Sequence, residues 1–177
     1  MRKAGAALAL LLVAGPALAR DSQLPLRNGL TPLDQREAWG LGFTLGTPFG
    51  LTLKRYLAGS NSWDAYVALA YGPGLRVGAD WLWGLGRLEQ HAKFELDLYA
   101  GVGPFVGALQ GPCGPGFFPD RCNGDAYAGG RVPVGVELLL REVPLALSLE
   151  VAPGLGFGPG RAGFLLDLDL GIRWLFR

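Results

Sequence analysis

From residue 39 to residue 176, apolar side chains alternate with small or polar ones at a period of two. The first stretch sets Trp39, Leu41, Phe43 and Leu45 against Gly40, Gly42, Thr44 and Gly46. Successive side chains of an extended strand point to opposite faces, so this period predicts strands with one apolar face. Helices would need apolar residues three and four positions apart, and they would not tolerate 29 glycines in 177 residues.

The alternation divides the chain into eight expected strands. They are residues 39–46, 49–57, 63–71, 75–83, 94–106, 131–140, 145–155 and 164–176. Eight strands can close on themselves, which removes the unpaired edges of a sheet and leaves an interior just wide enough for side chains. We therefore predict an all-β fold, an eight-stranded antiparallel up-and-down transmembrane β-barrel.

The composition indicates which solvent surrounds the barrel. Half of the residues are hydrophobic, 18% are charged, and only three are lysine. Soluble domains are roughly 25% charged. This balance excludes a disordered chain, and a net charge of +1 argues against nucleic-acid binding. We expect a protein whose outer surface contacts lipid.

The first residues have the pattern of a secretory signal peptide. Arg2 and Lys3 precede an uncharged stretch that is rich in Leu and Ala and ends with small residues at Ala17 and Ala19. A retained membrane helix is the alternative, but the apolar run is short for a span of about 20 residues, and Pro16 would break it. We expect a signal peptide over residues 1–19, a periplasmic lead-in over 20–38 and the barrel over 39–177.

The less apolar face of the strands combines Gly and Ala with charged residues, as suits a narrow lumen. The expected lumen charge network comprises Lys54, Asp64, Arg76, Asp80, Glu95, Asp97, Arg131, Glu137, Glu150, Asp167, Asp169 and Arg173. Paired charges that fill the interior are one interpretation. A small cation-selective pore is the other, because acids outnumber bases. Lumens of this size are usually filled, which favours the network.

Aromatic residues on the apolar face gather at one end of the expected strands. Counting strands up and down from a periplasmic start places six of them at the periplasmic side: Trp39, Trp63, Trp83, Phe94, Trp174 and Phe176. Girdles of aromatic residues at the bilayer interface are typical of outer-membrane barrels.

Residues 107–125 form the longest expected loop and contain both cysteines, Cys113 and Cys122. Outside the cytoplasm we expect these two to form a disulfide. A metal site is the alternative, but two ligands without a nearby histidine are too few. With Phe117 and Phe118, the loop is a candidate surface for a partner or for lipopolysaccharide.

Catalytic residues are not apparent. The single histidine, His91, falls in an expected periplasmic turn, and Ser148 lies in mid-strand without a neighbouring base. We expect no enzyme activity, no cofactor and no metal. The alternatives are a soluble exported lipocalin-like barrel that binds an apolar ligand and, with less support, a lipid A-modifying enzyme.

Several segments resemble known proteins. They are residues 45–52 (LGTPFGLT), 80–83 (DWLW), 131–135 (RVPVG), 149–154 (LEVAPG) and 171–176 (GIRWLF). On the basis of these segments, the chain resembles the small eight-stranded outer-membrane barrels similar to OmpA, OmpX and OmpW. It also resembles an uncharacterised family of predicted outer-membrane barrels. The last strand is similar to the signal read by the barrel-assembly machinery, except that Arg177 follows Phe176.

The resemblance implies a location in the cell outer membrane. The expected function is that of a non-enzymatic integral outer-membrane β-barrel with a structural, adhesive or minor transport role. Its expected partners are outer-membrane lipid, lipopolysaccharide and, during biogenesis, the barrel-assembly machinery. We expect a monomer that does not bind nucleic acid.

Overall fold

The computed structural model describes residues 38–57, 60–69, 74–108, 126–158 and 161–176. The predicted signal peptide, all of the lead-in except Ala38, and the predicted disulfide between Cys113 and Cys122 lie outside the described residues, as does Arg177. Within the described part of the chain, no helix has the length and apolar character needed to cross a membrane.

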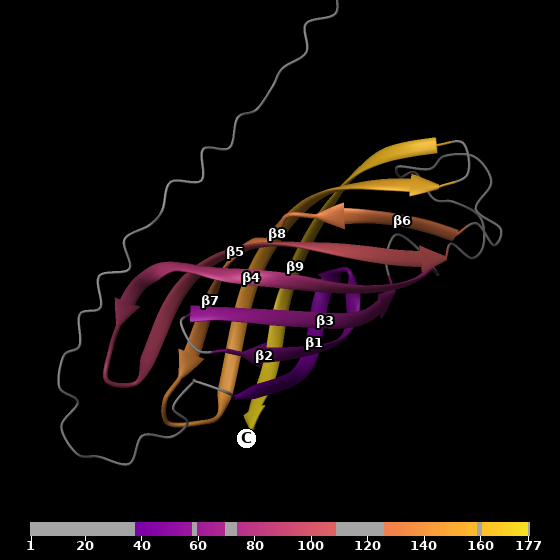
Figure 1. Ribbon diagram of the computed structural model, residues 1–177. Helices are drawn as coiled ribbons and strands as arrows, with labels where there is room; N and C mark the ends of the chain where they lie inside the picture. Colours follow the sequence, from indigo (N-terminus) through magenta and orange to yellow (C-terminus); the bar gives the residue numbers. More distant parts are fainter. Residues whose placement is uncertain (1–37, 58–59, 70–73, 109–125, 159–160, 177) are drawn as a thin grey trace, which may run out of the picture. The chain divides into compact units, whose positions relative to one another are not determined.

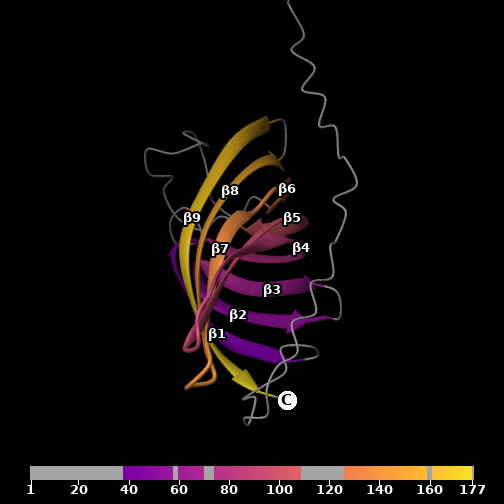
Figure 2. The ribbon, with the colours of Figure 1, turned by 90° about the vertical axis from the view of Figure 1, so that its left-hand side faces the viewer.

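Apart from the 3₁₀ conformation of Ser60, the regular structure in the described part of the chain is β-strand. The strands are β1 (Trp39–Thr47), β2 (Phe49–Tyr56), β3 (Asn61–Leu69), β4 (Leu75–Gln90), β5 (Phe94–Ala108), β6 (Ala126–Arg131), β7 (Val134–Leu140), β8 (Leu145–Gly158) and β9 (Arg161–Phe176). Every pairing between them is antiparallel (Figures 1 and 2).

Hydrogen bonds close the sheet into a ring of eight strands. The first and last strands pair along the whole of β1, from Trp39 opposite Phe176 to Thr47 opposite Leu168. β6 and β7 share one position in the ring, because both pair with β5 on one side and β8 on the other. We call the end at Trp39 and Phe176 the terminal end, and the end at Thr47 the far end.

One predicted strand, 131–140, is two strands in the structure. β6 begins at Ala126, and the ladder is interrupted before β7 begins at Val134. The interruption contains Pro133, which has no N–H to donate to a neighbouring strand. The backbone remains tied to both neighbours, because Val132 N donates to Pro153 O at 2.9 Å and Gly101 N donates to Pro133 O at 2.8 Å.

The connection expected between the strands 75–83 and 94–106, which contains His91, is also mostly strand. β4 continues to Gln90, so only residues 91–93 connect it to β5. Register shifts between Gly84 and Gly86 and between Arg87 and Glu89 mark irregularities in this part of the ladder. Extra residues at bulges disturb the period of two, which is why the alternation stops early in the sequence. Since β3 begins only at Asn61, opposite Trp83, the β4–β5 hairpin projects beyond β3 (Figure 1).

The two faces of the ring differ in the way that the alternation predicted. Side chains directed inward are small, polar or charged and mostly buried, whereas those directed outward are apolar and largely exposed. Glycine permits close strand contact at the β1–β9 pair: a Cβ on Gly42 would lie 1.8 Å from the carbonyl oxygen of Ile172. The side chains therefore sort into a polar interior and an apolar exterior.

Candidate functional site

The predicted charge network lies inside the ring. Eleven of its twelve members are buried: Lys54, Asp64, Arg76, Asp80, Glu95, Arg131, Glu137, Glu150, Asp167, Asp169 and Arg173. Asp97, the twelfth, is half-buried on the same strand face as Glu95. Burying so many charges is costly unless each is paired or hydrogen-bonded, so the contacts between them determine what this interior can do.

Arg131 is the centre of one group of ion pairs. Its Nε lies 3.1 Å from Asp80 Oδ2, its Nη2 lies 3.3 Å from Glu150, and its Nη1 lies 3.3 Å from Asp167. Asp167 also accepts hydrogen bonds from both terminal nitrogens of Arg76, and the bond from Nη1 is 3.2 Å long. A single guanidinium therefore holds carboxylates from β4, β8 and β9 together.

A second group lies nearer the terminal end. The Lys54 Nζ is 2.8 Å from Glu137, whose Oε1 also accepts a hydrogen bond of 2.9 Å from the Tyr56 hydroxyl. Arg173 pairs with Asp64 at 2.5 Å and lies 3.7 Å from Glu137. These contacts join β2, β3, β7 and β9 across the interior of the ring.

Hydroxyl groups satisfy further hydrogen-bonding positions of the charged groups. Thr52 donates to Asp64, and Arg173 Nη1 donates to the Ser148 hydroxyl at 2.8 Å. The Tyr99 hydroxyl donates to Glu150 at 2.9 Å. The predicted network did not include these hydroxyl groups. Their positions on the inward face of the alternation could have indicated that they belong to it.

Aromatic rings also contact the cations. The Lys54 Nζ lies 4.8 Å from the centroid of the Tyr99 ring, and the Arg131 Cζ lies 4.4 Å from that of Tyr66. The Arg76 Cζ is 5.1 Å from the Phe105 centroid. Such contacts stabilise cations where water is excluded.

Glu95 and Asp97 pair with arginines at the terminal end of the ring. Arg87, on the projecting part of β4, lies 3.2 Å from each of these two carboxylates, and Arg141 also pairs with Glu95. Sequence reasoning missed both arginines, because it placed them in turns. These pairs form the edge of the polar interior at the terminal end.

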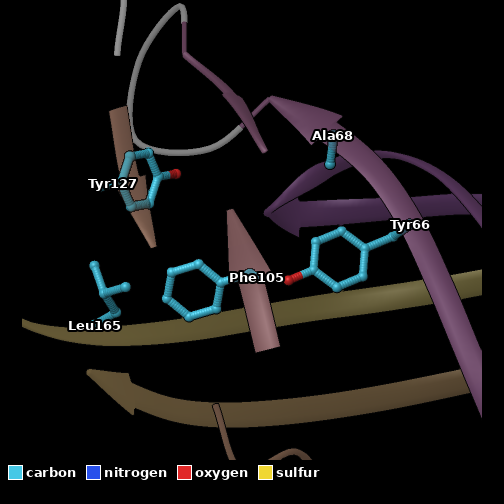
Figure 3. Close-up of a cluster of buried hydrophobic side chains, with 5 residues drawn as sticks. All are labelled: Tyr66, Ala68, Phe105, Tyr127 and Leu165. Carbon is cyan, nitrogen blue, oxygen red and sulfur yellow. The ribbon is translucent and has the colours of Figure 1, made fainter. Parts of the chain in front are cut away.

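Apolar clusters lie on either side of the charged layer. Near the far end the cluster comprises Tyr66, Ala68, Phe105, Tyr127 and Leu165 (Figure 3). Near the terminal end the cluster comprises Ala38, Tyr56, Leu139, Ala146 and Leu175. The interior is therefore layered, with the ion pairs between two sets of buried apolar side chains.

The central layer carries more acids than bases. Its bases are Lys54, Arg76, Arg131 and Arg173; its acids are Asp64, Asp80, Glu137, Glu150, Asp167 and Asp169. Asp169 lies opposite Glu150 in the β8–β9 ladder and belongs to none of the ion pairs described above. Six acids against four bases give the layer a formal charge of −2 when all of them are ionised.

The outward face is almost entirely apolar. Exposed large side chains occur on every described strand except β6, with examples such as Phe43, Leu51, Val67, Trp81, Val102, Val134, Leu149 and Leu168. A groove of about 570 Å³ on this face is lined by Leu75, Val77, Val106, Ala128 and Phe157, among others. These five residues are exposed, so the groove is on the outside of the ring and not in its interior.

The six predicted girdle residues lie on the outward face toward the terminal end. Trp83, Trp174 and Phe176 are exposed, while Trp39, Trp63 and Phe94 are half-buried. The predicted girdle did not include Trp81, which is exposed and lies opposite Trp63 in the β3–β4 ladder.

The two residues considered for catalysis, His91 and Ser148, have different environments. His91 is exposed between β4 and β5, and its ring stacks on Phe94 with a centroid distance of 5.3 Å. Ser148 is buried and hydrogen-bonded to Arg173. Among the described residues, no group of three or more His, Cys, Asp or Glu side chains has an arrangement that could hold a metal ion.

The described residues thus form an antiparallel ring of eight strands with many exposed apolar side chains. A comparison of the chain with protein-family models, with curated proteins and with solved structures found no match.

Proposed function

We propose that this protein is an integral β-barrel of the bacterial outer membrane with a non-enzymatic, structural role. In this proposal the ring crosses the bilayer, and its terminal end faces the periplasm. The observation that carries the proposal is the distribution of side chains, since ion pairs fill the interior while Leu, Val, Phe and Trp cover the exterior. A water-soluble ring would be expected to have the reverse distribution.

Burial energetics support a lipid environment for the exterior. Each Å² of apolar surface exposed to water costs about 25 cal/mol, and soluble monomers rarely expose contiguous apolar patches larger than a few hundred Å². The closed ring suits the bilayer because its strands pair with neighbours on both sides. The shortest unbroken strands have eight or nine residues, close to the roughly 9–11 that a tilted strand needs to cross the hydrocarbon core.

The filled interior favours a structural or adhesive role over transport. Apolar clusters lie on both sides of the central ion pairs, so side chains of both kinds occupy the interior. The barrel would act as a monomeric anchor in contact with outer-membrane lipid and lipopolysaccharide, assembled by the barrel-assembly machinery.

Membrane fractionation tests this proposal. We expect the protein to remain in the outer-membrane fraction after a urea wash and to migrate differently on gels before and after boiling, because the closed ring resists detergent until it is heated. Recovery as a soluble periplasmic monomer would contradict the proposal.

Cysteine labelling separates this proposal from a soluble barrel that binds an apolar ligand. In a background with Cys113 and Cys122 replaced by alanine, Val134→Cys places a thiol on the exposed face of β7. We expect a lipid-phase probe to label it. The matched variant is Ser148→Cys, because Ser148 is buried on the inward face of β8 and should stay unlabelled. Labelling of Val134→Cys by water-soluble reagents alone would favour the soluble barrel.

A minor transport role is the second candidate, and the excess of acids in the central layer favours it. Such a charge would attract cations if water reached it. In planar bilayers we expect no steady conductance from the refolded protein, because its interior is filled. A stable cation-selective conductance would replace the structural role with transport.

A further inference from the structure

One charged residue breaks the apolar exterior. Apart from the projecting β4–β5 hairpin, Arg55 is the one charged side chain that the described strands direct outward. Its neighbours in β2, Lys54 and Tyr56, are both buried in the interior. If the exterior contacts lipid, as proposed above, this guanidinium is a charge on a surface otherwise suited to hydrocarbon.

Two tryptophans surround Arg55. Trp39 of β1 and Trp63 of β3 lie directly opposite it in the two ladders that β2 forms. The Arg55 Cζ is 4.7 Å from the centroid of the Trp39 ring, and the two indoles meet edge to face with centroids 5.5 Å apart. All three side chains are half-buried. The aromatic pair thus restrains the arginine without covering it.

The stacking leaves the hydrogen-bonding capacity of Arg55 unused. A guanidinium has five N–H donors in its own plane, and contact with an aromatic face occupies none of them. No carboxylate among the described residues forms an ion pair with Arg55. At the edge of a bilayer, the group that best matches two parallel N–H donors is a phosphate.

The position of Arg55 along β2 indicates which leaflet of the membrane supplies that phosphate. It lies opposite Trp39, the first residue of β1, and Trp39 in turn lies opposite Phe176, the last residue of β9. Tryptophans at a strand end belong at the level of the lipid headgroups. With the terminal end in the periplasm, this level is the periplasmic leaflet, whereas lipopolysaccharide lies in the opposite leaflet.

We propose that Arg55, framed by Trp39 and Trp63, binds the phosphate of a glycerophospholipid headgroup in the periplasmic leaflet. This inference rests on the proposed membrane location. The guanidinium donates to the phosphate oxygens, and the indoles lie against the adjoining glycerol and upper acyl chain. The site orders one lipid at the point where β1 to β3 meet the membrane surface.

Lipid binding measured by native mass spectrometry tests the site. The refolded full-length protein is equilibrated in maltoside micelles with phosphatidylglycerol and, separately, with a digalactosyl diacylglycerol of the same acyl chains but without phosphate. We expect the first bound molecule of phosphatidylglycerol to have a higher affinity for the protein than the first bound molecule of the galactolipid. Arg55→Gln should weaken that binding about five-fold, as expected for one basic residue at an anionic lipid surface. Arg55→Lys should give an intermediate loss, because it keeps the charge but not the planar pair of donors.

Two controls sharpen the test. Arg87→Gln removes an exposed arginine from the same end of the ring, where it is already paired with acids, and should leave lipid binding unchanged. An equal loss in both variants would mean that only net charge matters and would overturn the proposal. Displacement of the lipid by excess inorganic phosphate would overturn it as well, in favour of a site for free phosphate.

The outcome also separates this inference from the proposed function. Arg55→Gln should keep the heat-modifiable gel mobility of the unsubstituted protein, because it changes one outward side chain. If the unsubstituted protein fails to remain in the membrane fraction, the proposed function itself is wrong. If it remains there but binds phosphatidylglycerol and galactolipid equally, only the Arg55 site is wrong.

Discussion

Replacing Arg131 with methionine is expected to lower the free energy of unfolding of the refolded protein by about 3–5 kcal/mol. Arg131 forms ion pairs with Asp80, Glu150 and Asp167 at the centre of the ring. Methionine matches much of its length but leaves Asp80 and Glu150 without this cation in a buried layer, whereas Asp167 keeps its ion pair with Arg76. Urea titration, followed by gel mobility without boiling and by tryptophan fluorescence, measures the change.

The matched control is Arg87→Met. The Arg87 side chain is 43% exposed and also contacts two acids, so it differs from Arg131 chiefly in its access to water. Exposed ion pairs contribute about 0–1 kcal/mol, and we expect a loss within that range. Equal effects from the two substitutions would show that water screens the interior, and would contradict an interior filled by ion pairs.

Gly42→Ala is expected to destabilise the closure of the ring by at least about 1–3 kcal/mol, the usual cost of overpacking. The added methyl would lie 1.8 Å from Ile172 O and 2.7 Å from the Cα of Arg173. Both are backbone atoms of β9, so the clash can be relieved only by moving β1 and β9 apart. The fraction of refolded protein with heat-modifiable mobility, together with its urea midpoint, reports the effect.

Gly130→Ala is the control for this substitution. Gly130 is exposed on β6, and the nearest atom to an added Cβ is 3.7 Å away, an ordinary van der Waals distance. This variant should fold as well as the unsubstituted protein. If it loses as much stability as Gly42→Ala, loss of glycine as such is the cause, and the close contact between β1 and β9 is not.

The strands could be predicted from the sequence wherever the two faces differ strongly in side-chain character. The expected strand at 39–46 ends one residue before β1 does, and 94–106 ends two residues before β5. The prediction was wrong where glycine and proline weaken the pattern. Gly129 and Gly130 in β6 provide no alternation to detect, and Pro133 interrupts the ladder within what was expected to be one strand.

The inward position of the charged residues was predictable, but their partners were not. Lys54 pairs with Glu137, 83 residues away, and Arg173 pairs with Asp64, 109 residues away. These pairs form across the ring, and their choice depends on how far each strand is shifted against the next. The alternation assigns a residue to a face but contains no information on this shift.

The sequence by itself determined the class of structure, because a period of two is a local property of the extended chain and needs no knowledge of distant residues. It also determined which side chains share a face. Only the tertiary structure decided that β1 pairs with β9, that Arg131 holds three carboxylates, and that Arg55 lies between Trp39 and Trp63. Ring closure and strand register arise from pairings distant in the chain, so these contacts exist only once all of the strands are in place.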